Sequence, residues 1–152
     1  MKMKSFVLLF FVAIVLNSCN VDKCDVYCSS GPLTLSFELL DKTTGENLFT
    51  NNTFNPEDIS VLDLDNNGSS IQFEFNSENN INLINLGPFG WGTNIANYRL
   101  KVGDRNIFTL NIDAKEKTED CCSFVQVNEL EITNTGFELN PDTGIYEILV
   151  EL

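Results

Sequence analysis

The sequence predicts an all-β protein folded as an antiparallel β-sandwich of about seven to nine strands. Apolar residues alternate with polar ones over much of the chain, as at Leu33, Leu35, Phe37 and Leu39. This period of two is typical of strands that bury one face. Turn-forming Gly, Asn and Asp separate the runs, and no run has the period of an amphipathic helix.

Eight alternating runs are expected to form the strands. They are residues 33–39, 59–64, 71–75, 81–86, 98–102, 107–112, 124–132 and 145–150. Turns are expected at residues 44–45, 66–68, 103–104 and 141–144, and a single helical turn at 56–58. This spacing fits an immunoglobulin-like or transthyretin-like sandwich, and a small lipocalin-like barrel is the alternative.

The N-terminal segment has the pattern of an export signal. Lys2 and Lys4 precede an apolar run, Phe6 to Leu16, which is too short to cross a bilayer that needs about 20 apolar residues. The run ends in Leu16-Asn17-Ser18-Cys19. This arrangement resembles the signal peptide and lipobox of bacterial lipoproteins, in which the chain is cut before the cysteine and the cysteine is acylated.

The lipoprotein resemblance implies the organisation of the chain. Residues 1–18 would be a signal peptide, Cys19 the lipidated residue, 19–32 a tether and 33–152 a single β domain. Asn20 stands where an Asp retains lipoproteins at the inner membrane in the well-studied systems. The expected location is therefore the outer membrane, with the lipid as the membrane contact and the domain on the periplasmic face or the cell surface.

Charge and composition exclude several functions. The chain has 22 acidic and nine basic residues, and all acidic ones follow Cys19, so a chain that begins there has a formal net charge of −15. Nucleic acid is not an expected partner, because it is bound through clustered Lys and Arg. Histidine is absent, which excludes Ser-His-Asp chemistry. With no nucleophile motif either, we expect no enzyme and no cofactor.

The segment Leu39 to Leu48 contains Thr44-Gly45-Glu46 directly after a predicted strand. It resembles the start of carboxypeptidase-regulatory-like, transthyretin-like sandwiches, in which the first strand runs into a Thr-Gly-Glu turn. Residues 98–102 would be a later strand of such a domain. Together with the lipobox and the abundant Asn, the chain also resembles small lipoproteins of the Bacteroidota. Neither resemblance implies a catalytic residue.

Four cysteines remain after Cys19: Cys24, Cys28, Cys121 and Cys122. An even number in an exported protein suggests two disulfides, with three possible connectivities. We favour pairing the first two with the last two, because closing loops of about a hundred residues stabilises by roughly 4–5 kcal/mol. Two short local rings are the alternative. A structural zinc site is less favoured, because adjacent cysteines make a poor pair of ligands.

One segment matches the EF-hand calcium loop literally, through Asp63, Asp65, Asn67, Gly68 and Glu74. An EF-hand needs a flanking helix on each side, whereas both flanks here alternate like strands. We therefore predict a β-hairpin that turns at residues 66–68, and no metal site.

The segment Gly87-Pro88-Phe89-Gly90-Trp91-Gly92 contains the only tryptophan of the chain. Its glycines and proline predict a loop and not a regular strand. Phe89 and Trp91 are candidates for a ligand-binding platform for a sugar ring or a partner. The alternative is that both aromatic side chains are buried and close one end of the sandwich.

Two classes of function remain. The first is a non-enzymatic envelope lipoprotein, a binding or structural module for a glycan, a peptide or a partner protein. The second is a small-molecule carrier with a lipocalin-like cavity. The Gly-x-Trp near the first strand of lipocalins is missing, which disfavours the carrier.

Overall fold

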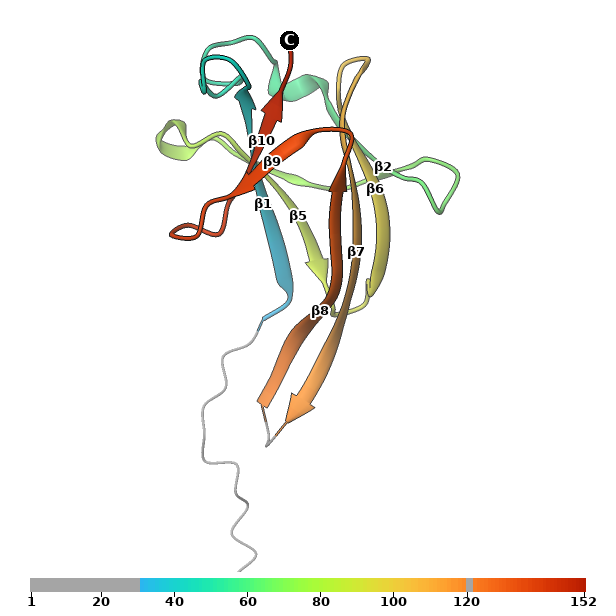
Figure 1. Cartoon of the computed structure of the whole chain (residues 1–152). Coiled ribbons are helices and arrows are strands. Elements are labelled where there is room, and N and C mark those ends of the chain that lie inside the picture. Colours follow the sequence, from blue (N-terminus) through green and yellow to red (C-terminus); the bar gives the residue numbers. More distant parts are fainter. Residues whose placement is uncertain (1–30, 120–121) are drawn as a thin grey trace, which may run out of the picture.

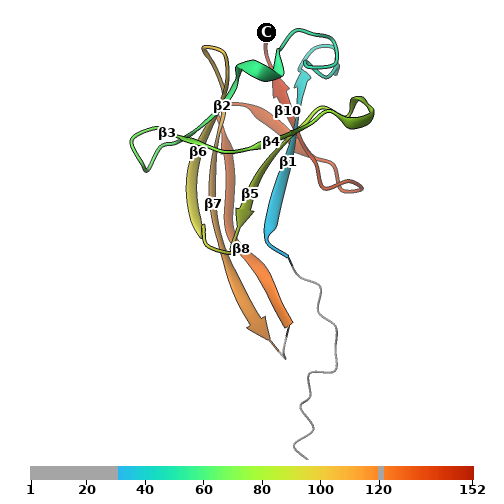
Figure 2. The same ribbon diagram turned by 180° about the vertical axis from the view of Figure 1, so that it is seen from behind.

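The computed structural model describes residues 31–119 and 122–152. Two five-stranded sheets form the domain (Figures 1 and 2). In spatial order, the first sheet contains β4 (Glu74–Asn76), β5 (Leu83–Phe89), β1 (Leu33–Asp41), β10 (Tyr146–Val150) and β9 (Gly136–Leu139). The second contains β3 (Ser69–Ile71), β2 (Ile59–Asp63), β6 (Ile95–Val102), β7 (Arg105–Glu119) and β8 (Cys122–Thr133).

The predicted β-sandwich is confirmed. Neighbouring strands are antiparallel except β1 and β10, which pair in parallel. The sheets do not close into a barrel, so the lipocalin-like alternative for the fold is wrong. The short helical turn at 56–58 is present as the 3₁₀ helix η1 (Pro56–Asp58), and a second, η2 (Glu78–Asn80), precedes β5.

Alternate side chains of each strand fill the space between the two sheets. Leu35, Phe37 and Leu39 of β1 are buried, as the period of two predicts. The Phe37 ring lies 4.9 Å from the Phe108 ring of β7, measured between centroids, and thus joins the first sheet to the second. Large side chains occupy the interior on both sides of this contact, so the sandwich has a packed core where a carrier would have its cavity.

The run 71–75 is not the single strand that we predicted. β3 ends at Ile71 and pairs with β2, whereas β4 begins at Glu74 and pairs with β5 of the other sheet. Phe75 packs against Phe49, with ring centroids 5.0 Å apart. The chain therefore crosses between the sheets at Gln72 and Phe73. Alternation continues through the crossing, which is why the sequence pattern does not reveal it.

Two further strands differ from expectation. β5 continues to Phe89, where Leu33 of β1 is its partner, although Gly87 and Pro88 predict a loop. A register shift between Leu33 and Leu35 accommodates this irregular end. Gly87 is required there, because a Cβ atom would lie 2.7 Å from the Leu33 carbonyl oxygen. β9 was not predicted, since its four residues are all exposed and show no buried face.

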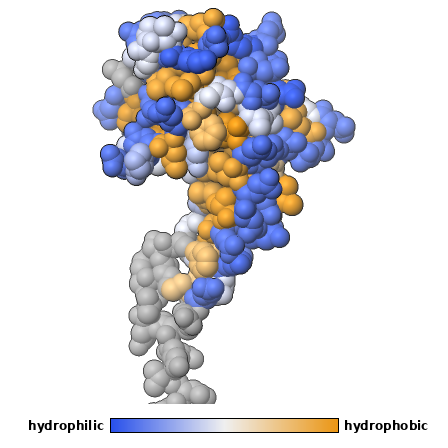
Figure 3. Space-filling view, in the orientation of Figure 1, coloured by the Kyte–Doolittle hydropathy of each residue, from blue (hydrophilic) through white to orange (hydrophobic). Residues whose placement is uncertain are grey.

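The β7–β8 hairpin is longer than predicted and projects past the end of the sandwich where β1 begins (Figure 1). Apolar side chains lie along β8 and beside β9 among hydrophilic ones (Figure 3), and Val127, Phe137 and Leu139 are exposed.

No helix within residues 31–119 and 122–152 is long and apolar enough to cross a membrane.

The predicted signal peptide and the lipidation at Cys19 lie outside the described residues, as does the tether up to residue 30. Cys122, which begins β8, is disulfide-bonded. Cys24, Cys28 and Cys121 lie outside the described residues, so the predicted pairing stays a prediction.

Candidate functional site

The structure separates the two aromatic residues that the sequence proposed as a platform. Phe89 is 1% exposed and belongs to the core, with its ring 6.1 Å from that of Tyr98. It closes the end of the sandwich and cannot present its ring to a ligand. The prediction of Phe89 as a platform residue is therefore wrong, and Phe89 is a core residue. Trp91 is 42% exposed and is the residue of this pair that can contact a ligand.

Backbone contacts hold the loop that carries Trp91. The Gly90 N–H donates to the Thr93 carbonyl at 2.8 Å, and the Glu116 N–H donates to the Gly90 carbonyl at 3.1 Å. Gly90 is buried against β8, and a Cβ atom there would lie 2.5 Å from Cγ1 of Val125. The loop is thus fixed against the β7–β8 hairpin, while Trp91 beside it remains at the surface.

A groove of about 360 Å³ lies beside Trp91, at the lower end of the range for ligand pockets. Its apolar wall includes Ile71 and Pro88, and Gln72 and Thr93 bring polar groups. Flat aromatic surface, aliphatic carbon and a few hydrogen-bonding groups meet there, as in sites that bind small uncharged ring compounds.

Tyr98 forms the buried side of this groove and is 8% exposed. Burial raises the pKa of the Tyr98 phenol above its usual value and the charge of Asp63 raises it further, whereas a hydrogen bond with the Thr93 side chain lowers it. The phenol is therefore protonated at neutral pH, and its hydroxyl group can donate a hydrogen bond.

A second pocket, of about 270 Å³, adjoins the first and shares Gln72, Gly87 and Pro88 with it. Thr34 and Asn85 line it from the neighbouring strands β1 and β5. The Asn85 Oδ1 accepts a hydrogen bond from Ser36 Oγ at 2.8 Å, which leaves the Asn85 Nδ2 donors for a ligand. Sequence reasoning missed this pocket, because its residues come from segments far apart in the chain.

The calcium-loop residues are not gathered around one point. Asp63 pairs with Ser69 across the β2–β3 hairpin, and the Gly68 N–H donates to the Asp63 carbonyl at 2.7 Å. The predicted hairpin is confirmed. Glu74, the proposed final ligand, lies on β4 of the other sheet. Within residues 31–119 and 122–152, no three Asp, Glu or Cys side chains form a group that could hold a metal ion.

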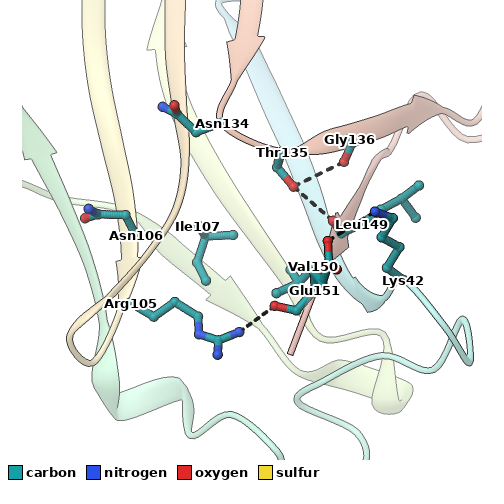
Figure 4. A pocket seen from close by; sticks show the side chains of 10 residues that line it. All are labelled: Lys42, Arg105, Asn106, Ile107, Asn134, Thr135, Gly136, Leu149, Val150 and Glu151. Carbon is teal, nitrogen blue, oxygen red and sulfur yellow. Dashed lines mark hydrogen bonds and ion pairs between the residues drawn. The ribbon is translucent and has the colours of Figure 1, made fainter.

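Another pocket, of about 240 Å³, lies at the opposite end of β1 (Figure 4). Lys42 and Arg105 line it, but both contact Glu151. Lys42 Nζ lies 3.2 Å from Glu151 Oε2, and Arg105 Nη1 donates to the Glu151 carbonyl at 2.8 Å. The two cationic groups are thus already partnered within the chain, which makes this pocket a weaker candidate than the groove beside Trp91.

The candidate site is therefore the Trp91 groove with its adjoining pocket, at the end of the sandwich where β1 begins. Its side chains can contact the flat face of a ring and pair with polar groups at the edge of that ring. No protein-family model, no curated protein and no solved structure matches the chain.

Proposed function

We propose that the protein is a lipid-anchored envelope module that binds its ligand in the groove beside Trp91. The observation that carries this proposal is the exposure of the Trp91 ring next to a groove of about 360 Å³. Tryptophan supplies a large, rigid contact surface and is among the residues that most often dominate binding energy.

Binding without catalysis agrees with the residues that line the two pockets. Only Glu74 and Tyr98 among them have ionisable side chains, and each lines a different pocket. General acid–base or nucleophilic catalysis needs a base within hydrogen-bond reach of the group that reacts. The packed core disfavours the carrier function, because a carrier needs a cavity inside the fold.

The proposed lipid at Cys19 would place the site near a membrane, at the outer membrane of the cell. Phe89, two residues before Trp91, pairs with Leu33, where the predicted tether ends. Residues 20–32 span at most about 45 Å when fully extended. A lipid on Cys19 would thus hold the groove within about that distance of the bilayer, where envelope glycans and membrane-bound partners are found.

Replacing Trp91 by Ala should weaken ligand binding by more than about 1 kcal/mol, which is roughly fivefold. Because Trp91 is the only tryptophan, its fluorescence reports binding to the unmodified protein, and calorimetry measures the variant, which has no tryptophan. We would titrate the protein with fractionated envelope polysaccharides and envelope peptides, and one fraction should shift the emission. Ile95→Ala, which removes another exposed apolar side chain outside the groove, is the matched control. If no fraction changes the Trp91 emission, the proposed site is wrong.

Replacing Cys19 by Ala should remove the protein from the membrane fraction or leave an unprocessed precursor. The reason is that acylation needs the cysteine sulfur and the amino group released by cleavage. Detergent phase partitioning and the intact mass measure the two outcomes. Replacing Cys28 by Ala in the same background is the control for loss of a thiol. Unchanged partitioning of the Cys19 variant would contradict lipid anchoring.

A further inference from the structure

The two adjoining pockets form one extended site, which we call the joined groove. They meet at Gln72, Gly87 and Pro88, which line both. Trp91 lies in one half, and Thr34 and Asn85 lie in the other. A ligand that filled only the Trp91 half would leave the second half to water.

The two halves offer different but complementary chemistry. Trp91 and Tyr98 supply aromatic surface in the first half. The second half adds the polar side chains of Thr34, Gln72, Glu74 and Asn85 beside the apolar Phe73 and Pro88. Those of Thr34, Gln72 and Glu74 make no hydrogen bond or ion pair with the described part of the chain. These groups can pair with a ligand without first breaking a contact inside the protein.

Charge restricts the ligand further. No Lys or Arg lines either half of the joined groove, whereas Glu74 does, and Asp63 is close enough to act on the Tyr98 phenol. Phosphate and carboxylate groups are bound through cationic side chains or clustered N–H donors. An anionic ligand would therefore meet repulsion in both halves.

We infer that the joined groove binds a linear, neutral oligosaccharide, an inference that rests on the proposed function of the Trp91 groove. A sugar ring has an apolar C–H face that can cover the Trp91 ring, and hydroxyl groups around its edge. The next units of the chain would bring their hydroxyl groups to Gln72, Asn85 and Thr34. An extended peptide fits less well, because it gains affinity from main-chain bonds to a strand edge and Pro88, where the halves meet, has no N–H.

The test uses the lipoprotein in detergent micelles with defined soluble sugars. Cellohexaose, laminarihexaose, maltohexaose and mannohexaose would each be titrated by calorimetry and by Trp91 fluorescence, together with glucose and mannose. At least one hexasaccharide should bind about tenfold or more tightly than its own monosaccharide, because it occupies both halves. Hexagalacturonate, the anionic probe, should bind more weakly than the neutral hexasaccharide.

Variants in each half assign the contacts. Asn85→Ala should reduce hexasaccharide affinity about fivefold or more and leave monosaccharide affinity unchanged. Thr34→Ala should act in the same direction. It removes an exposed side chain that makes no hydrogen bond with the described part of the chain, so it tests the second half if Asn85→Ala impairs folding. Trp91→Ala should weaken binding of both sugars by more than about fivefold, as measured by calorimetry. Gln126→Ala, outside both pockets, is the control and should change neither affinity.

The possible failures separate this inference from the function on which it rests. Equal affinity for the monosaccharide and the hexasaccharide, unaffected by Asn85→Ala and Thr34→Ala, would overturn the extended site and leave the Trp91 site in place. Binding of none of these neutral sugars, or tighter binding of hexagalacturonate, would overturn the sugar assignment. A peptide that shifts Trp91 emission would then still support the proposed function. If no envelope fraction changes the Trp91 emission, both the oligosaccharide inference and the proposed function are wrong.

Discussion

Replacing Phe37 by Ala should lower the free energy of unfolding by about 3–5 kcal/mol. Phe37 is 0% exposed, and its ring lies 4.9 Å from that of Phe108 and 5.6 Å from that of Tyr146, measured between centroids. The substitution removes apolar surface from the core and leaves a cavity between two sheets that can close only in part. Since single domains are stable by about 5–15 kcal/mol, this is a large share of the total.

Chemical denaturation followed by circular dichroism measures the loss. Phe137→Ala is the matched control, because Phe137 is the same residue type but is 40% exposed on the edge strand β9. It should cost clearly less, about 1–2 kcal/mol, because its side chain is already partly exposed and its removal leaves no enclosed cavity. Equal losses for the two variants would show that the space between the sheets is not the main core.

Replacing Gly90 by Ala should cost about 2–5 kcal/mol and displace the Trp91 loop. The φ angle of Gly90 is +84°, and side chains disfavour such backbone by about 1–2 kcal/mol. The added Cβ would also lie 2.5 and 2.8 Å from the two Cγ atoms of Val125, a steric overlap that costs about 1–3 kcal/mol. Both contributions act on the loop that positions Trp91, so its fluorescence should change as well.

Gly92→Ala separates the backbone cost from the steric one. Gly92 has a φ of +99°, but a Cβ atom there would have no neighbour within 4 Å. It should therefore cost only the backbone contribution, about 1–2 kcal/mol. In a Val125→Ala background, Gly90→Ala should become less costly, because the overlapping atoms are gone. If the Gly90 and Gly92 variants lose the same stability in both backgrounds, the contact with β8 does not constrain the loop.

The hairpin at the calcium-like segment shows what local sequence can predict. Asn67 and Gly68 adopt positive φ angles, 53° and 72°, as the turn requires, and alternation on both sides favours strands. The crossing at Gln72 and Phe73 shows the limit. A strand that changes sheets keeps its alternation, so the pattern around Ile71 and Phe75 reads as one strand although it belongs to two.

Phe89 and Trp91 show the same limit at the site. Residues two apart share a face in a regular strand, so the sequence suggests that both rings could contact one ligand. The strand β5 ends at Phe89, and the positive φ angle of Gly90 turns the chain, so one ring enters the core and the other stays at the surface. The sequence could identify this segment as a candidate binding loop, but it could not show which of the two rings stays exposed to a ligand.

The sequence by itself determined the strand content, the main turns and the sandwich class, because period-two burial and turn chemistry are properties of neighbouring residues. Only the tertiary structure decided which sheet each strand joins, including the parallel pairing of β1 with β10. It also decided the second half of the joined groove, where Thr34, Glu74 and Asn85 meet. Contacts of this kind depend on how the whole chain packs, because they join residues that are distant in sequence, and no local sequence pattern encodes them.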